Sequence, residues 1–137
     1  MRYVVDTSVV AAWYLDEEFS DAAREWQQRL LDGQIQFVVP EIHYWEFGNV
    51  LRTWVRRARL ARELALEIWE LHLDTPLVVE SADRSAVLEV ALELEATVYD
   101  AVFISLSRSL DIPLLTAERT TTPWVTKLGK NVLSVRG

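Results

Sequence analysis

Short runs of apolar, mostly β-branched residues alternate along the whole chain with longer segments of helical character. Five such runs lie at residues 2–6, 35–40, 76–81, 112–116 and 131–135. Strands that alternate with helices pair in parallel, and a parallel sheet is covered by helices on both faces. The alternation therefore predicts an α/β fold, a three-layer α/β/α sandwich with a central parallel sheet of about five strands.

Helical segments fill the intervals between these runs. Pro40 suits the first turn of a long helix that runs to about Arg57, and Ser81 is a candidate cap for a helix at 83–95. Further helices are expected at 8–15, 20–31 and 61–73. A last helix is indicated by an apolar stripe at Tyr99, Phe103, Leu106 and Leu110.

Composition limits the class of protein. The 137 residues fit a single domain spanning 1–137, and the chain has no cysteine for a disulfide or a thiolate metal site. The N-terminal apolar stretch is interrupted by Asp6 and lacks the pattern of a signal peptide. No segment has the ~20 apolar residues of a membrane span. We therefore expect a cytoplasmic protein with no membrane contact.

The charge is unevenly distributed. A net charge of −7 argues against a surface that coats nucleic acid indiscriminately, yet residues 51–62 contain five arginines and no acid. This basic stripe fits contact with one anionic partner, and a solvated helix face explains it equally well. Trp45 and Trp54 lie on opposite faces of the same helix, so at least one should be exposed. It could stack on a base or anchor a partner helix, with a buried aromatic core as the alternative.

Four acidic residues stand apart from the surface clusters of acids. Asp6 ends the first apolar run, and Glu46 lies in an otherwise apolar helix, "YWEFGNVL". Asp100 falls in the first turn of the Tyr99 helix, and Glu118 follows the fourth run at the start of the next helical stretch. Parallel sheets bind ligands beyond the carboxyl ends of their strands, which is where Asp6 is expected.

Carboxylates gathered in one cleft raise one another's pKa, and a divalent cation relieves their repulsion. Oxygen ligands without His or Cys favour Mg²⁺ or Mn²⁺ over Zn²⁺. Such a metal orients a phosphodiester, lowers the pKa of a water and stabilises the leaving oxygen. The four acids are therefore candidate ligands of Mg²⁺ or Mn²⁺, although any one of them alone could be a surface residue or a helix cap.

Four segments of the chain resemble the PIN-domain family, and within it the VapC-type toxins of bacterial and archaeal toxin–antitoxin pairs. In chain order they are "VVDTSVV", "VPEIHYWEFGNVL", "TVYDAVFISLS" and "LLTAE". The resemblance implies an acidic pocket for Mg²⁺ or Mn²⁺ made by Asp6, Glu46, Asp100 and Glu118, supported by Thr7, Ser8 and Thr116. It also implies a PIN-like fold, a homodimer, a cognate antitoxin that packs near the basic stripe, and endonucleolytic hydrolysis of RNA to 5′-phosphate and 3′-hydroxyl ends.

Glu118 departs from the family pattern, which usually has Asp at this position. The extra methylene predicts a weakened or altered second metal site. It leaves open the alternative that the chain is a catalytically weak or inactive PIN-like module that binds RNA or a protein. A small phosphatase or receiver-like protein is disfavoured, because Ser8 stands where an Asp-x-Asp motif needs its second acid.

The two histidines are assigned packing or capping roles. His43 lies three residues before Glu46 on one helix face, but no second histidine is near it in sequence, and His72 ends a different helix. Neither a His–carboxylate metal site nor a histidine-based ribonuclease is therefore expected.

Overall fold

The computed structural model describes all 137 residues, Met1–Gly137, and contains the predicted alternation of strands and helices. In chain order the elements are β1 (Arg2–Val5), α1 (Thr7–Tyr14), α2 (Ser20–Leu31), β2 (Gln36–Val39), α3 (Ile42–Arg56), α4 (Arg62–Leu73), β3 (Val78–Val79), α5 (Arg84–Leu94), α6 (Val98–Leu110), β4 (Leu114–Thr116), α7 (Pro123–Leu128), a 3₁₀ turn (Gly129–Asn131) and β5 (Val132–Ser134).

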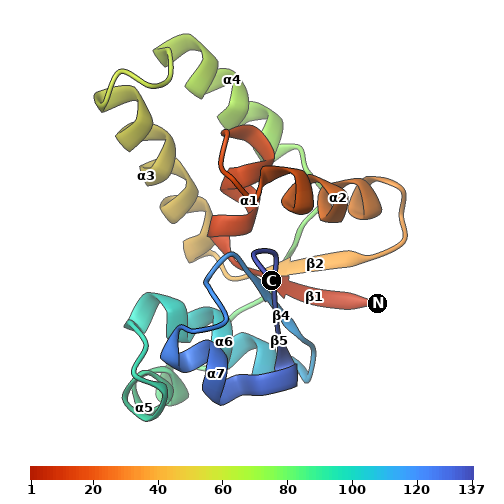
Figure 1. Cartoon of the computed structure of the whole chain (residues 1–137), viewed down its shortest axis with the longest axis vertical. Coiled ribbons are helices and arrows are strands. Elements are labelled where there is room, and N and C mark those ends of the chain that lie inside the picture. The colour runs from red at the N-terminus through yellow and green to blue at the C-terminus, as the bar shows by residue number, and fades with distance from the viewer.

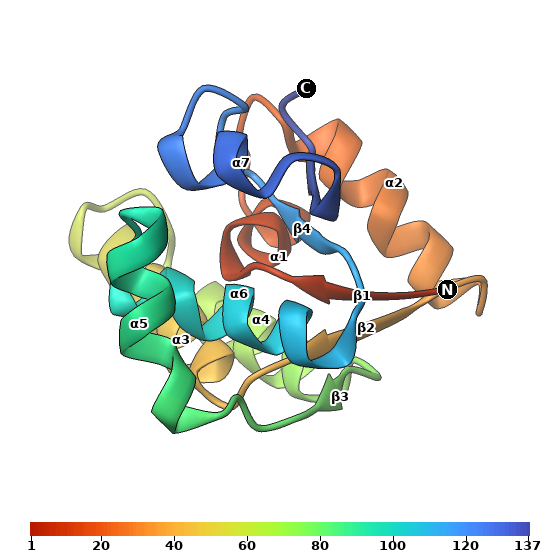
Figure 2. The same cartoon turned by 90° about the horizontal axis from the view of Figure 1, so that it is seen from below.

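The five strands form one sheet in the order β3-β2-β1-β4-β5, and every pair is parallel. Figure 2 shows the strands side by side from β4 through β1 and β2 to β3. The prediction of a parallel five-stranded sheet is confirmed. Strand β1 is central, and the chain extends the sheet first on one side of it and later on the other.

Helices cover both faces of this sheet, as the apolar strands require (Figure 1). On one face, Val5, Val39 and Leu115 pack with residues of helices α1 to α4. On the other face, Val4 and Val38 pack with residues of α5, α6 and α7. Successive strand residues thus point into opposite layers, and the predicted three-layer sandwich is confirmed.

Three local predictions differ from the structure. Asp83, not Ser81, caps α5, because its carboxylate accepts a hydrogen bond from the Ser85 N–H at 3.0 Å. Strand β3 keeps only two residues of the predicted run at 76–81. Glu118 lies in the loop after β4, because the next helix begins only at Pro123. No helix of the chain is both long enough and apolar enough to cross a membrane.

Candidate active site

Asp6 lies at the carboxyl end of β1, where the order of the sheet changes direction. The boundary between β1 and β4 is a topological switch point, the place where open parallel sheets bind ligands. The Asp6 N–H donates to the Leu115 carbonyl at 2.9 Å, and the Thr116 hydroxyl donates to Asp6 Oδ2 at 2.9 Å. Strand β4 therefore holds both the backbone and the side chain of Asp6.

Glu46 reaches the same region from helix α3. The Thr7 hydroxyl, in the first turn of α1, donates to Glu46 Oε1 at 2.8 Å. The neighbouring Ser8 hydroxyl accepts a hydrogen bond from the Ala117 N–H at 3.3 Å, which ties the start of α1 to the end of β4. The three hydroxyl residues predicted to support the site, Thr7, Ser8 and Thr116, thus all contact its acids or its backbone.

Asp100 and Glu118 complete the predicted set. Asp100 lies in the first turn of α6, whose N-cap Thr97 accepts the Asp100 N–H at 3.0 Å. The Glu118 N–H donates to the Thr116 hydroxyl at 3.1 Å, and the Glu118 carboxylate accepts from the Thr122 hydroxyl at 3.3 Å. The Glu118 carboxylate is therefore held by its own loop.

The four carboxylates act on one another electrostatically. Burial, and to a smaller degree the carboxylates of Asp100 and Glu46, raise the pKa of Asp6 from 3.8 to about 7. Burial and then Asp100 raise the pKa of Glu46, while burial and then Glu118 raise the pKa of Asp100. Asp100 thus interacts with each of the other three, and residues far apart in the sequence converge in space.

No protein cation relieves this repulsion. The five ion pairs of the chain involve only other acids, namely Asp16, Glu18, Glu93 and Glu95. Mutually repelling carboxylates without a counterion match the oxygen ligands that Mg²⁺ and Mn²⁺ prefer. No group of three or more His, Asp or Glu side chains is yet arranged to hold a metal ion. The chemistry of the donors nevertheless fits a hard divalent cation.

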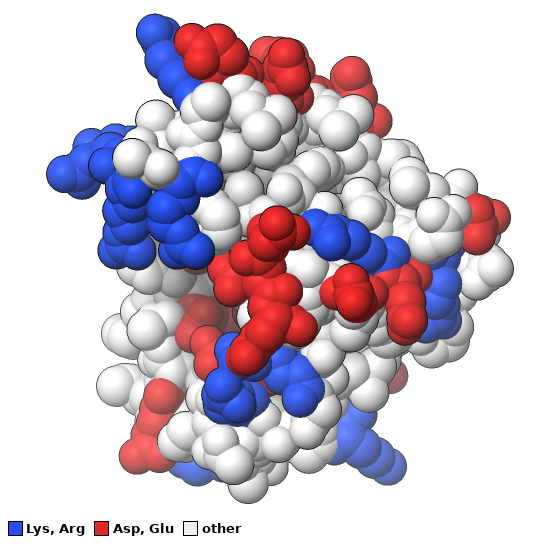
Figure 3. All heavy atoms as spheres, turned by 45° about the horizontal axis from the view of Figure 1, so that its top comes forward, with Lys and Arg blue, Asp and Glu red and all other residues white.

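Two exposed aromatic side chains lie next to the acids. Trp45 is 64% exposed and Tyr99 is 60% exposed, and they directly precede Glu46 and Asp100 in the sequence. With Asn49 and Glu46 they line a hollow of about 400 Å³. Of the apolar stripe predicted for α6, Phe103 and Leu106 are buried but Tyr99 is exposed. The expectation that Trp45 or Trp54 is exposed is confirmed. Figure 3 shows acidic atoms recessed in a hollow of the surface, with basic side chains gathered beside it.

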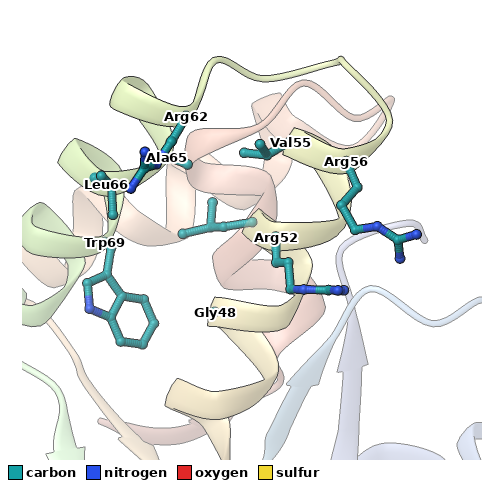
Figure 4. Close-up of a pocket in the computed structure, with 9 residues that line it drawn as sticks. Gly48, Arg52, Val55, Arg56, Arg62, Ala65, Leu66 and Trp69 are labelled. Atoms are coloured by element: carbon teal, nitrogen blue, oxygen red, sulfur yellow. The ribbon is translucent and has the colours of Figure 1, made fainter.

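The basic stripe borders a second hollow, the groove between α3 and α4 (Figure 4). Its volume is about 430 Å³, and its lining includes the apolar residues Leu51, Val55, Leu66 and Trp69 and the arginines Arg52, Arg56 and Arg62. The two helices approach closely where a Cβ atom on Gly48 would lie 3.0 Å from the Trp69 ring. The groove therefore combines an apolar floor with a cationic rim.

The contact between the two histidines was not predicted from the sequence. His43 and His72 are fully buried, and their Nε2 atoms lie 2.8 Å apart. They are on different helices, so only the packing of α3 against α4 brings them together. The three-residue spacing of His43 and Glu46 places both on one helix face, but nothing in the sequence indicates that His72 lies beside them.

The sheet order and the acidic residues at the topological switch point place the chain among α/β proteins with a polar site at the carboxyl end of the central strand. The chain matches the PIN domain family model over residues 3–120, and it belongs to the PIN domain family. It is 28% identical to Ribonuclease VapC3 of Pyrobaculum aerophilum over 123 residues, which are 87% of this chain and 91% of the relative.

A solved structure supports the fold. The crystal structure of PAE2754 from Pyrobaculum aerophilum superimposes with a TM-score of 0.75 at 24% sequence identity. The match covers 99% of this chain and 85% of that one. The PIN-like α/β fold predicted from the sequence is thereby confirmed.

Proposed function

We propose that this chain is a Mg²⁺- or Mn²⁺-dependent endoribonuclease that acts as the toxin of a toxin–antitoxin pair. The observation that carries the proposal is the convergence of Asp6, Glu46, Asp100 and Glu118 at the switch point with no protein cation among them. Membership of the PIN domain family and the similarity to Ribonuclease VapC3 support it.

Asp6, Glu46, Asp100 and Glu118 would hold the ion, which when bound would neutralise charge on a phosphodiester and lower the pKa of an attacking water. The protein's part is to keep the carboxylates ionised and in place. Thr116 and Thr7 donate hydrogen bonds to Asp6 and Glu46, which favours their charged forms and opposes the effect of burial. The rigid end of β1 fixes the position of Asp6.

The aromatic side chains beside the acids favour RNA as the substrate. Single-stranded RNA is recognised through bases stacked on aromatic rings. Trp45 and Tyr99 offer exposed rings one residue from two of the candidate ligands, and the Asn49 side chain adds hydrogen-bond capacity. A nucleotide next to the scissile phosphate would stack there.

Cleavage of a 5′-labelled structured RNA tests the proposal. We expect internal cleavage with Mg²⁺ or Mn²⁺, none with EDTA, and products carrying 5′-phosphate and 3′-hydroxyl ends. Equal cleavage with EDTA would contradict the metal mechanism. Asp100→Ala should abolish cleavage, and Asp16→Ala is its matched control, since the Asp16 side chain is 98% exposed and lies outside the site.

One alternative is that the chain binds RNA or a protein without cutting it. Two observations favour this reading: no metal-ligand group is assembled, and Thr122 holds the Glu118 carboxylate in the loop. A crystal soaked in Mn²⁺ discriminates between the two. Anomalous scattering from Mn²⁺ at Asp6 and Asp100 supports the nuclease, and its absence at millimolar Mn²⁺ supports the binding module.

The partner we propose is an antitoxin that lays an amphipathic, acidic helix in the groove between α3 and α4. The apolar floor suits such a helix, and Arg52, Arg56 and Arg62 complement its charge. A homodimer is the second expected assembly, supported by the exposed Leu88 and Leu92 on successive turns of α5. Leu66→Glu should abolish antitoxin binding without changing the oligomeric state, and Leu92→Glu should do the reverse.

A further inference from the structure

A row of polar side chains runs from Glu46 into the apolar layer between α1, α3 and α4. Thr7 Oγ1 lies 2.8 Å from Glu46 Oε1 and 2.9 Å from His43 Nδ1. His43 Nε2 lies 2.8 Å from His72 Nε2. His72 Nδ1 in turn lies 3.0 Å from the hydroxyl oxygen of Tyr14. We call these five residues the buried hydrogen-bond chain.

The two imidazoles of the buried hydrogen-bond chain lie among aromatic rings. Neither is exposed, and the Phe47 ring packs on both, with centroid distances of 6.2 Å to His43 and 4.6 Å to His72. Burial lowers the pKa of His43 to about 3 and that of His72 to about 4, so both rings are neutral at neutral pH. A neutral imidazole carries one N–H and one acceptor nitrogen.

The direction of the chain follows from counting hydrogens. Four groups, namely two hydroxyls and two neutral imidazoles, supply one polar hydrogen each for four hydrogen bonds. An ionised Glu46 can only accept, so Thr7 must donate to it. Thr7 must then accept from His43 Nδ1–H, which leaves His43 Nε2 as an acceptor.

The same reasoning extends to the far end. His72 donates from Nε2–H to His43, so His72 Nδ1 must accept from the Tyr14 hydroxyl. Every bond receives one hydrogen, and all four point toward Glu46. If the hydrogen bonds ran the other way, Thr7 would donate its one hydrogen to His43. The 2.8 Å contact between Thr7 and an ionised Glu46 would then contain no hydrogen.

We propose that His43, His72 and Tyr14 are positioning residues for Glu46, which hold its carboxylate in one orientation through the hydroxyl of Thr7. Residues that hydrogen-bond to a metal ligand commonly orient it, and their loss lowers metal affinity. Hydrogen bonds in such a chain also polarise one another, which strengthens the last donor. The proposal deepens the proposed function in one respect, because it takes Glu46 to be a ligand of the divalent cation.

Histidine ring-nitrogen NMR tests the direction of the chain without reference to metal or RNA. We expect His43 to be protonated on Nδ1 and His72 on Nε2. Tyr14→Phe should shift the Nδ1 resonance of His72, whose donor it removes. Tyr3→Phe is the matched control, since it removes a hydroxyl outside the chain. The opposite tautomers in the wild-type protein would overturn the proposal.

Mn²⁺ affinity, measured by calorimetry, tests the positioning. We expect His43→Leu to weaken binding about tenfold. His43→Asn should restore most of the loss, because its side-chain N–H can take the place of Nδ1–H. Tyr14→Phe should give a smaller loss in the same direction, and Tyr3→Phe none. Equal affinities in all four variants would overturn the proposal, since a purely structural role predicts no such rescue.

The two proposals fail in different ways. If the wild-type protein binds no Mn²⁺, the proposed function fails. The positioning is then decided by crystal structures of the wild-type protein and Tyr14→Phe, in which one removed oxygen atom leaves the fold intact. A changed Glu46 side-chain conformation supports it, and an unchanged one overturns it.

Discussion

The acidic site and the buried hydrogen-bond chain share Glu46 and are joined through Thr7, yet they treat polar groups in opposite ways. In the acidic site, carboxylates face one another without a counterion, and the pKa of Asp6 rises to about 7. In the chain, two fully buried imidazoles each find a partner for both nitrogens. The buried hydrogen-bond chain stabilises the fold, whereas repulsion among the carboxylates lowers the stability of the fold.

This difference distinguishes residues that stabilise the fold from residues proposed to bind a ligand. Polar groups that are fully paired hold one arrangement, and unpaired charges store repulsion that only a ligand relieves. Changes in the acidic site should therefore reduce function while raising the stability of the metal-free protein. Changes in the buried hydrogen-bond chain should lower the free energy of unfolding.

The sharpest contrast is expected at Asp100, the carboxylate that interacts with the other three. Asp100→Asn should lower the rate of RNA cleavage about a thousandfold, the loss of about 4 kcal/mol of transition-state stabilisation. It should also raise the free energy of unfolding in EDTA, because the repulsion with Asp6 and Glu46 disappears. Cleavage kinetics and urea denaturation measure both. The exposed Asp16→Asn is the control, and a fall in both quantities would contradict the comparison.

The pH dependence of stability compares the two regions in one experiment. The pKa of Asp6 is higher in the folded chain, so its ionisation opposes folding. Without metal it should cost about 4 kcal/mol of unfolding free energy as pH rises from about 4 to about 7. The pKa values of His43 and His72 are lowered, so their contribution is lost as pH falls below 6.5.

Asp6→Asn separates these opposing slopes. In EDTA, the variant should lose more stability than the wild-type protein on acidification from about pH 7 to about pH 4, because protonation of Asp6 no longer offsets part of the loss caused by the histidines. Saturating Mg²⁺ should make the pH profile of the wild-type protein as steep as that of the variant, because the cation binds the folded site and keeps Asp6 ionised. Urea denaturation at a series of pH values measures all three. Identical profiles for the variant and the wild-type protein would refute the assignment to Asp6.

Interrupting the buried hydrogen-bond chain at its centre should have a smaller effect on the free energy of unfolding. His72→Leu leaves the Nε2 atom of His43 without a partner and the Tyr14 hydroxyl with only its 3.4 Å contact to the Thr75 hydroxyl. The cost should be about 1–3 kcal/mol in the free energy of unfolding. The double variant His43→Leu, His72→Leu removes both buried rings, so its cost should be less than the sum of the single costs. Additive costs in this double-mutant cycle would argue against coupling between the rings.

The smallest effect is expected at Glu118. Thr122 holds its carboxylate in the loop, and releasing one hydrogen bond is worth about 1 kcal/mol, or about fivefold in affinity. Glu118→Asp is too short to keep this contact, so it should raise Mn²⁺ affinity by about that factor. Thr122→Val, which removes the same hydrogen bond, should act in the same direction. If only Glu118→Asp has an effect, side-chain length and not the Thr122 contact is responsible.

Much of the fold and part of the candidate site could be predicted from local pattern. Apolar runs such as 2–6 and 112–116 can be buried only as strands covered on both faces, and parallel pairing follows from the helices between them. That arrangement brings the carboxyl ends of strands to one edge of the sheet, which placed Asp6 correctly. Helix starts were less predictable, because Asp83 and Ser81 are both plausible caps and the backbone geometry selects one.

The sequence by itself determined the layered sheet and the residue types available at the end of its central strand. Only the tertiary structure decided which side chains meet. His43 and His72 lie 29 residues apart on separate helices, and no periodicity in the chain relates them. Contact between such residues depends on how α3 packs against α4, which is a property of the whole apolar layer and of no single segment.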